Sequence, residues 1–465
     1  MSGGKWGLLL LCIALVVWLL WPRQTPDADE LARQASLLAA RGDTDAARKL
    51  ADQCLQANAG QPAARLLLGQ LDFADRNWEA ALGHLSQIST EDGQWVQARQ
   101  TAATIYHRQT FQLSRAEAAY RDVLSVRPDD PQALENYAQL LGLCGRRTEA
   151  IPLVLQLIKG GVETDLLMLL SRESGALTDP DLLQAATLAS PEDINPLLGQ
   201  TMAAISQLDF VKAQQLLDQA SALAERPVAL VEMRGRVLLA SEQTEQLLEW
   251  AAALPEDRSA EMWFVLGELA ERRGDPSGAL RCCWEGLKQR PESLAAMNQM
   301  ARLLKSQGRS EDAALFFERV ELLNAFRDRQ RLAIMSEERP TFDQFFAMIE
   351  AYYQVGRHWE ALAWGRLAQD MQPGHAPLNR LLSAVEATTD TLPLQLTVNA
   401  ANPALAVDLS DLALPALQPG QMTDRIRDLL AGIGISGGDR SIRAVSPEAA
   451  MGHSRPPPSP SQPHP

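Results

Sequence analysis

Several features that mark other kinds of protein are scarce in this sequence. Aromatic residues make up only 5% of its 465 positions, and valine-rich alternating runs and Asn-Gly hairpin turns are nearly absent. Alternation and hairpin turns are the usual signs of β-structure, so their scarcity argues against a β-rich fold. Hydrophobic residues nevertheless make up 46% of the chain, and alanine and leucine are abundant. This mixture favours an all-α protein with a large buried core.

The chain also lacks any long run of basic residues. Lysine and arginine number 43 against 58 aspartates and glutamates, which gives a formal net charge of −15. A polyanion such as DNA would meet net repulsion from a chain of this charge, and no basic segment offsets it. We therefore expect no nucleic acid among its partners.

The common sequence signatures of catalysis and metal binding are missing as well. None of the six histidines lies in an H-x-x-H or H-E-x-x-H spacing, and no G-x-S-x-G elbow or P-loop occurs. One G-x-G-x-x-G match, Gly432 to Gly437, follows a stretch that looks helical, whereas a dinucleotide site needs a preceding strand. We interpret it as a glycine turn. The sequence thus predicts no enzyme, no catalytic residue, no cofactor, no metal and no small-molecule substrate.

The spacing of the five cysteines indicates neither a zinc site nor a disulfide framework. No Cys-x-x-Cys pair occurs, and the number is odd. We interpret the cysteines as small apolar residues in helix packing, with a redox role for the adjacent Cys282 and Cys283 as the alternative. The five are Cys12, Cys54, Cys144, Cys282 and Cys283.

One long apolar run is present, at the N-terminus. Residues 6–21 read WGLLLLCIALVVWLLW, without a charge. These about 16 residues would span about 24 Å as a helix, slightly less than a ~30 Å hydrocarbon core, and tryptophans at both ends suit the membrane interfaces. The run ends in Leu-Leu-Trp-Pro-Arg, which lacks the small-residue pattern of a cleavage site. We expect an uncleaved signal anchor over residues 1–23, with residues 6–21 as a transmembrane helix in the lipid bilayer.

The charges beside this run indicate its orientation. Lys5 and the terminal amine precede it, whereas Arg23 is followed by Asp27, Asp29 and Glu30. Because positive residues favour the cytoplasmic side, we expect a single-pass membrane protein with a cytoplasmic N-terminus. The main body would then lie on the periplasmic or extracytoplasmic side.

A repeated pattern occupies most of the remaining chain. A copy has a large residue, usually a small residue four positions later, a glycine seven further on and an alanine five after that. Two antiparallel helices approach closely only where a side chain is small, and glycine can end the first helix in a left-handed conformation. The four clearest copies are residues 132–158, 261–291, 295–320 and 344–373; weaker copies fill the gaps, the most degenerate at 163–192.

The repeat resembles the tetratricopeptide-repeat (TPR) family, whose unit is about 34 residues. It resembles in particular the membrane-anchored TPR proteins of bacterial envelopes and, more weakly, the TPR segment of large exported FG-GAP/UnbV-type proteins. The resemblance implies an all-α TPR solenoid of about ten helix-turn-helix repeats over residues 28–386, ending in a capping helix. The matching positions are large Leu134, Trp263, Met297 and Phe345; small Ala138, Gly267 and Ala301; turn glycines Gly145, Gly274, Gly308 and Gly356; and alanines Ala150, Ala279, Ala313 and Ala361.

The repeat register separates core positions from groove positions. Trp263, Met297, Met300 and Phe317 fall on the core side. The family's concave groove is lined by first-helix residues beside the packing positions, so the resemblance implies a partner-binding groove. A basic stripe within it could hold a peptide carboxylate, and a solvated face is the alternative. The groove residues are Phe264, Glu268, Asn298, Arg302, Lys305, Phe346, Glu350 and Tyr353, and the stripe is Asn298, Arg302 and Lys305.

The pattern changes after Glu386. Residues 391–398 alternate like a short strand, and the chain ends in the proline tract SRPPPSPSQPHP. A proline-rich tract of this kind cannot pack a core. We expect residues 387–465 to form a low-complexity, Pro-rich and largely disordered tail.

An anchor, a repeat array and no catalytic signature together predict a binding protein. The leading interpretation is a membrane-anchored scaffold that binds partner proteins or peptides on its concave surface and assembles an envelope complex. The alternative is a targeting or regulatory module of a separately encoded enzyme or propeller protein.

Overall fold

The computed structural model describes residues 27–417, except for 163–165, 172–178, 224–226 and 335–339. These residues form twenty-one α-helices and two short 3-10 helices, with no strand among them. The all-α prediction is therefore confirmed for the described part of the chain. Residues 391–398, which alternate like a strand, form turns and bends instead. The predicted signal anchor at residues 1–23 lies outside the described residues.

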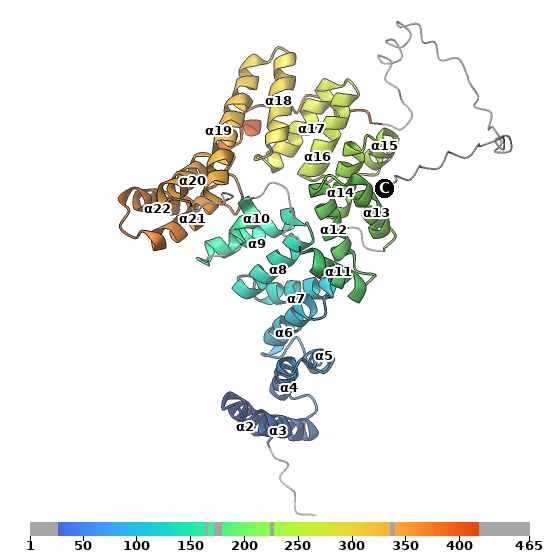
Figure 1. The fold of residues 1–465 in the computed structure, drawn as a ribbon, viewed down its shortest axis with the longest axis vertical. Coiled ribbons are helices and arrows are strands. Elements are labelled where there is room, and N and C mark those ends of the chain that lie inside the picture. The colour runs from blue at the N-terminus through green and yellow to red at the C-terminus, as the bar shows by residue number, and fades with distance from the viewer. Residues whose placement is uncertain (1–26, 163–165, 172–178, 224–226, 335–339, 418–465) are drawn as a thin grey trace, which may run out of the picture. The chain divides into compact units, whose positions relative to one another are not determined.

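Most helices pack antiparallel against the helix that precedes or follows them in the sequence, as Figure 1 shows. The first ten are α2 (Ala28–Ala40), α3 (Thr44–Ala57), α4 (Pro62–Ala74), α5 (Trp78–Leu85), α6 (Trp95–Arg108), α7 (Leu113–Val126), α8 (Pro131–Leu143), α9 (Arg147–Lys159), α10 (Leu167–Ser171) and α11 (Pro180–Ala189). The next six are α12 (Ile194–Ser206), α13 (Phe210–Ser221), α14 (Val228–Ala240), α15 (Thr244–Ala252), α16 (Ala260–Arg272) and α17 (Pro276–Gln289). The last are α18 (Leu294–Ser306), α19 (Ser310–Ile334), α20 (Phe342–Gln354), α21 (His358–Met371), α22 (Ala376–Thr389), η1 (Asn399–Ala401) and η2 (Pro403–Leu405).

The helical pairs explain the repeated sequence pattern. Small residues lie where paired helices cross: Ala138 and Ala301 are fully buried, and a Cβ added to Gly267 would lie 2.9 Å from the sulfur of Cys283 on the partner helix. Such close approach buries more apolar surface per helix. The second-helix alanines Ala150, Ala279, Ala313 and Ala361 are likewise buried.

The turns between paired helices need a left-handed residue. Gly145, Gly274, Gly308 and Gly356 all have φ between 72° and 79°. Weaker repeats reach the same conformation without glycine, as at Leu208 (φ 59°) and Glu242 (φ 57°). A side chain in this region is strained by roughly 1–2 kcal/mol, so these repeats keep the turn at a local cost.

The predicted core register is right at three of four positions. Met297 and Met300 are fully buried and Trp263 is 8% exposed. Phe317 is only partly buried, and its neighbour Phe316 is the fully buried residue. The assignment of Phe317 to the core was therefore wrong, although Ala313 on the same helix is buried as the register predicts. Four cysteines, Cys54, Cys144, Cys282 and Cys283, are buried and free, as expected of packing residues.

One longer helix stands out from the pairs. α19 has 25 residues, which is long enough to span a bilayer, but charged side chains are distributed along its whole length. No helix in the described part of the chain is long and apolar enough to cross a membrane.

The array also makes a contact between helices far apart in the sequence. α21 packs against α9 and α10, and we name this packing the return contact. At its centre Arg357, just before α21, donates to the backbone oxygen of Leu170 in α10 at 2.8 Å. The Tyr352 hydroxyl lies 2.8 Å from the Oγ of Ser171. An array in which each repeat touches only its sequence neighbours would lack such contacts.

The tail prediction needs correction for residues 391–417, which we name the strap. The strap packs on the second helices of the late repeats and is not disordered there. Trp284 of α17 donates its indole N–H to the backbone oxygens of Ala404 and Val407, each at 2.8 Å. Two glycines of the array leave room for strap residues: a Cβ added to Gly356 would lie 2.6 Å from Ala401, and one added to Gly278 would lie 2.8 Å from Pro415. The buried apolar residues of the strap are Leu396, Val398, Ala404, Val407 and Leu409. The prediction for residues 418–465 lies outside the described residues.

Candidate binding cavity

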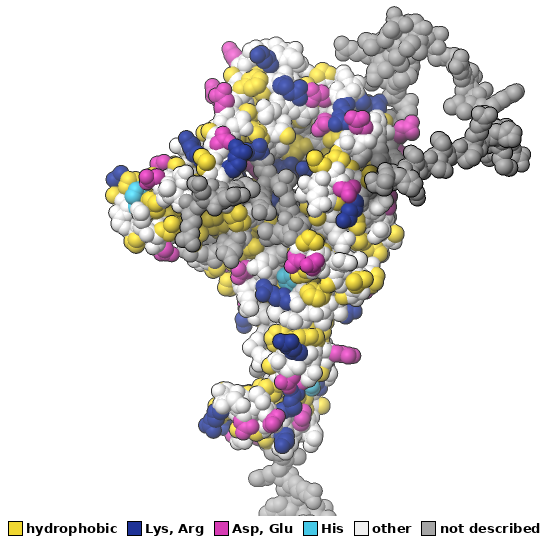
Figure 2. Space-filling view, viewed as in Figure 1, with side chains coloured by type: hydrophobic (Ala, Val, Ile, Leu, Met, Phe, Trp, Pro, Cys, Tyr) yellow, Lys and Arg dark blue, Asp and Glu magenta, His cyan; other side chains and the backbone are white. Residues whose placement is uncertain are grey.

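A cavity of about 1050 Å³ lies along the first helices of three consecutive pairs, α14, α16 and α18. Arg147 of α9 and Arg327 of α19 also line it. In Figure 2, Lys and Arg side chains lie around the hollow that the visible face shows between α16, α18 and α19. First helices therefore form the concave side here, as the repeat resemblance implies.

Four of the eight predicted groove residues line this cavity: Phe264, Glu268, Asn298 and Arg302. They come together because Gly267 and Ala301 set the same rotation of α16 and α18 about their axes. As partner-binding residues they stay predictions.

The other four predicted groove residues lie elsewhere. Lys305 lies one turn beyond Arg302, and its ammonium group is 5.9 Å from the ring centre of Phe317. Phe346, Glu350 and Tyr353 belong to α20, which contributes no residue to the cavity lining. Tyr353 stacks on His358, with ring centres 4.8 Å apart. The structure does not gather these four with the first four.

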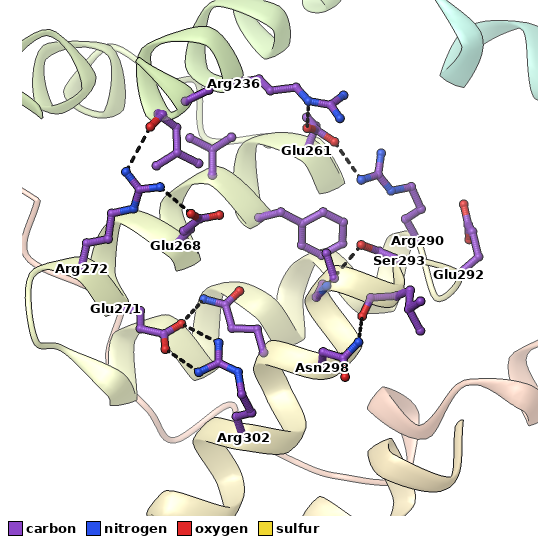
Figure 3. A pocket seen from close by; sticks show the side chains of 18 of the residues that line it. Arg236, Glu261, Glu268, Glu271, Arg272, Arg290, Glu292, Ser293, Asn298 and Arg302 are labelled. Atoms are coloured by element: carbon purple, nitrogen blue, oxygen red, sulfur yellow. Dashed lines mark hydrogen bonds and ion pairs between the residues drawn. The ribbon is translucent and has the colours of Figure 1, made fainter. Parts of the chain in front are cut away.

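Ion pairs order the wall formed by α16 and α18, as Figure 3 shows. Arg272 pairs with Glu268 at 2.6 Å, and Arg302 pairs with Glu271 at 3.1 Å. Asn298 donates to the backbone oxygen of Leu294 at 3.0 Å. The predicted basic stripe is thus only partly available, because two of its three members are engaged within the protein.

A second group of charges lies at the other end of the cavity. Glu261 accepts from Arg290 at 2.7 Å, and Arg236 approaches it at 3.9 Å. Glu292 lines the same end and is 7% exposed. The guanidinium of Arg290 also lies over the Phe264 ring, 4.8 Å from its centre. Phe264 is therefore covered by a cation on the cavity side.

Arg147 reaches this cavity from the return contact. It donates to the backbone oxygens of Leu169 at 3.0 Å and Leu170 at 2.9 Å. Burial, together with the nearby charge of Arg357, lowers the pKa of Arg147 to about 10. The guanidinium stays charged at neutral pH but lacks a carboxylate among its hydrogen-bond partners in the described residues.

A smaller cavity of about 230 Å³ adjoins the first, sharing Glu261, Arg290 and Glu292 with it. Its wall includes Leu396 and Thr397 of the strap and Glu232 of α14. Burial raises the pKa of Glu232. The strap therefore helps to enclose one side of the charged end.

Some residues that line the cavity were not predicted from the sequence. Arg236 follows Gly235 as Glu268 follows Gly267 and Arg302 follows Ala301, so the repeat register could have found it. Arg147 and Arg290 carry no such signal. Arg147 enters through the return contact, and Arg290 extends from the C-terminal end of α17.

One segment of the chain matches a known protein-family model. Residues 38–105 match the family model described as tetratricopeptide repeat. The match supports the TPR family. It covers α3 to α6 almost completely, and the helix pairs beyond it continue the same construction. TPR repeats generally bind other proteins or peptides, and the matching model describes a repeat, not a catalytic domain. No curated protein matches the chain.

Solved structures of similar chains have low identity and low TM-scores. The structure described as functional characterization of Pseudomonas aeruginosa pilF is 10% identical and covers 48% of this chain and 89% of that one, with a TM-score of 0.24. The APC/C hetero-tetramer Cut9–Hcn1 is 12% identical, with coverages of 87% and 90% and a TM-score of 0.32. The P58(IPK) TPR domain is 17% identical, with coverages of 71% and 98% and a TM-score of 0.24. Every TM-score is below 0.5, so no property of these proteins is carried over.

Proposed function

We propose that this chain is a membrane-anchored TPR scaffold that binds partner proteins or peptides in the cavity of α14, α16 and α18 and thereby assembles an envelope complex. The observation that carries the proposal is the cavity itself. Its volume of about 1050 Å³ slightly exceeds the roughly 300–1,000 Å³ range of small-molecule pockets. Its polar groups come from three successive first helices, an arrangement suited to an extended chain.

The membrane part of the proposal rests on the sequence. Residues 6–21 are apolar throughout and are flanked by Lys5 and Arg23. An anchor there would hold the array at the bilayer surface, with the N-terminus in the cytoplasm and the repeats outside it. Anchoring raises the local concentration of the array for partners in the same membrane.

Co-purification tests the proposal. The full-length chain, tagged at its C-terminus, is isolated from solubilised membranes of its own cells, and the accompanying proteins are identified by mass spectrometry. We expect the chain in the membrane fraction with a reproducible partner. We further expect that Arg302→Glu, which reverses a charge inside the cavity, removes that partner.

Lys305→Glu is the matched control, because it makes the same charge change one turn away on α18 and outside the cavity. Partner loss in Arg302→Glu but not in Lys305→Glu supports binding in the cavity. Equal loss in both variants, or recovery of the chain without partners, contradicts it. Fractionation of the chain with soluble proteins contradicts the anchor.

A further inference from the structure

The cavity differs in charge from the protein that contains it. The whole chain carries a formal net charge of −15. The described residues that line the cavity include six arginines and four glutamates, a formal excess of two positive charges. An acidic protein with a basic cavity attracts negative groups to that place and repels them elsewhere.

One of the two excess positive charges belongs to one end of the cavity, and Arg327 of α19 carries the other. Arg272 and Arg302, on the α16–α18 wall, are each matched by one glutamate. At the other end, Arg236 and Arg290 share the single carboxylate of Glu261, as Figure 3 shows. A guanidinium that shares a carboxylate keeps donors free for a second acceptor, since it has five N–H groups.

Arg147 adds a third cation to this end. It shares the backbone oxygen of Leu170 with Arg357, at 2.9 Å and 2.8 Å respectively, so two guanidinium groups converge on one neutral acceptor. Glu292 supplies one further negative charge. Among the residues that line the larger cavity, Arg147, Arg236 and Arg290 therefore face two carboxylates at this end, Glu261 and Glu292. Glu232 lies in the adjoining smaller cavity, where burial raises its pKa.

We propose that the end of the cavity formed by Arg147, Arg236 and Arg290 holds a carboxylate-rich segment of the partner protein. The inference rests on the proposed scaffold function and adds the chemistry of the bound segment. Guanidinium groups bind carboxylates through paired N–H donors, which gives both affinity and orientation. A segment with several acidic side chains can neutralise the excess at Arg236 and Arg290 together.

Defined peptides test the inference on the full-length protein in detergent. The probes are a fluorescein-labelled octapeptide of glutamate and a matched octapeptide of glutamine, and binding is followed by fluorescence anisotropy at low salt. We expect the glutamate peptide to bind at least about tenfold more tightly than the glutamine peptide, with the difference shrinking as salt is raised.

Arg236→Gln locates the site. Its side chain is 40% exposed and its nearest acidic partner is 3.9 Å away, so the fold does not depend on it. We expect this variant to weaken binding of the glutamate peptide about tenfold, and Lys305→Gln to leave it within about twofold. Equal binding of both peptides, or equal weakening in both variants, overturns the inference. If a partner co-purifies with the chain but the glutamate peptide does not bind, the proposal of an acidic segment is wrong. The scaffold function is then still supported.

Discussion

Arg147 and Arg357 donate hydrogen bonds to the same backbone oxygen, that of Leu170, from helices far apart in the sequence. One of them also lines the cavity, and the other is buried with Glu360. The return contact and the candidate binding cavity are therefore built from one connected group of charges. A substitution at the return contact should alter the position of Arg147 and therefore the charges that line the cavity, because Arg147 belongs to both.

Breaking the buried pair at the return contact should destabilise the protein strongly. Arg357 is 3% exposed and Glu360 is fully buried, and the two make paired hydrogen bonds. Arg357→Met leaves Glu360 buried without its cation, and we expect a loss of about 3–5 kcal/mol in the free energy of unfolding. Urea unfolding of the variant measures it.

The double variant Arg357→Met with Glu360→Met is the control. Removing both charges leaves no unpaired ion, so it should recover much of the stability lost by the single variant. A double variant less stable than the single one would show that the pair itself, not the orphaned carboxylate, determines the effect.

Replacing the non-glycine turn residue of a weak repeat with glycine should stabilise the protein. Leu208 is 74% exposed and has φ 59°, a conformation that favours glycine. Leu208→Gly should raise the free energy of unfolding by about 0.5–1 kcal/mol, because released strain exceeds the added chain entropy. Thermal or urea unfolding checks the sign.

Gly308→Ala is the opposite substitution at an equivalent turn. Gly308 has φ 79°, and an added Cβ would meet nothing within 4 Å. It should lose about 1 kcal/mol through backbone strain alone. If Leu208→Gly destabilised the protein as well, strain at these turns would not explain the glycine pattern.

The repeat construction was predictable from sequence because it depends on local rules. Gly267 lets two helices touch, and Gly145 ends a helix in the left-handed region; both effects involve residues close in the chain. The same rules identify Phe264, Glu268, Asn298 and Arg302 as residues on one side of α16 and α18. They also mark Glu242 as a turn position that lacks glycine.

Two features depended on contacts that sequence patterns do not carry. The return contact joins Arg357 to α10, a helix in the most degenerate repeat, where the signature is absent. The strap contains eight leucines and two valines but no helical periodicity, and the proline tract that follows it suggested disorder for the whole tail. The strap is ordered because Trp284 and Arg281 donate to its backbone oxygens and not because it forms a core of its own.

The strap should stabilise the late repeats. Leu409 and Ala404 of the strap are fully buried, and η2, which contains Ala404, packs against α17 and α19. A chain ending at Asp390 should unfold at a lower urea concentration than one ending at Leu417. Its free energy of unfolding should be lower by roughly 3 kcal/mol or more, because the apolar surface that the strap covers is then exposed to water. Identical unfolding of the two truncated chains would contradict the packing described for the strap.

Acid should destabilise the early repeats through His107. Burial lowers the pKa of His107 from 6.5 to about 4, so the folded protein holds it neutral. Its Nδ1 lies 3.2 Å from the Tyr120 hydroxyl. Because the unfolded chain binds the proton more tightly, stability is lost as pH falls from 6.5 towards 4. The loss should reach about 2 kcal/mol at pH 5.

His107→Gln should remove that part of the pH dependence. Unfolding free energies at pH 7.5 and pH 5 measure it in both proteins. A wild-type difference that the variant retains in full would place the acid sensitivity elsewhere.

Site-specific photo-crosslinking tests the central claim, that partners bind in the cavity, most directly. A benzophenone amino acid replaces Phe264, which lines the cavity, or Phe346, an equally half-buried aromatic residue on α20 outside it. The account predicts a partner crosslinked at position 264 and none at position 346, in intact cells with the full-length chain. A partner crosslinked at 346 and not at 264 would contradict it.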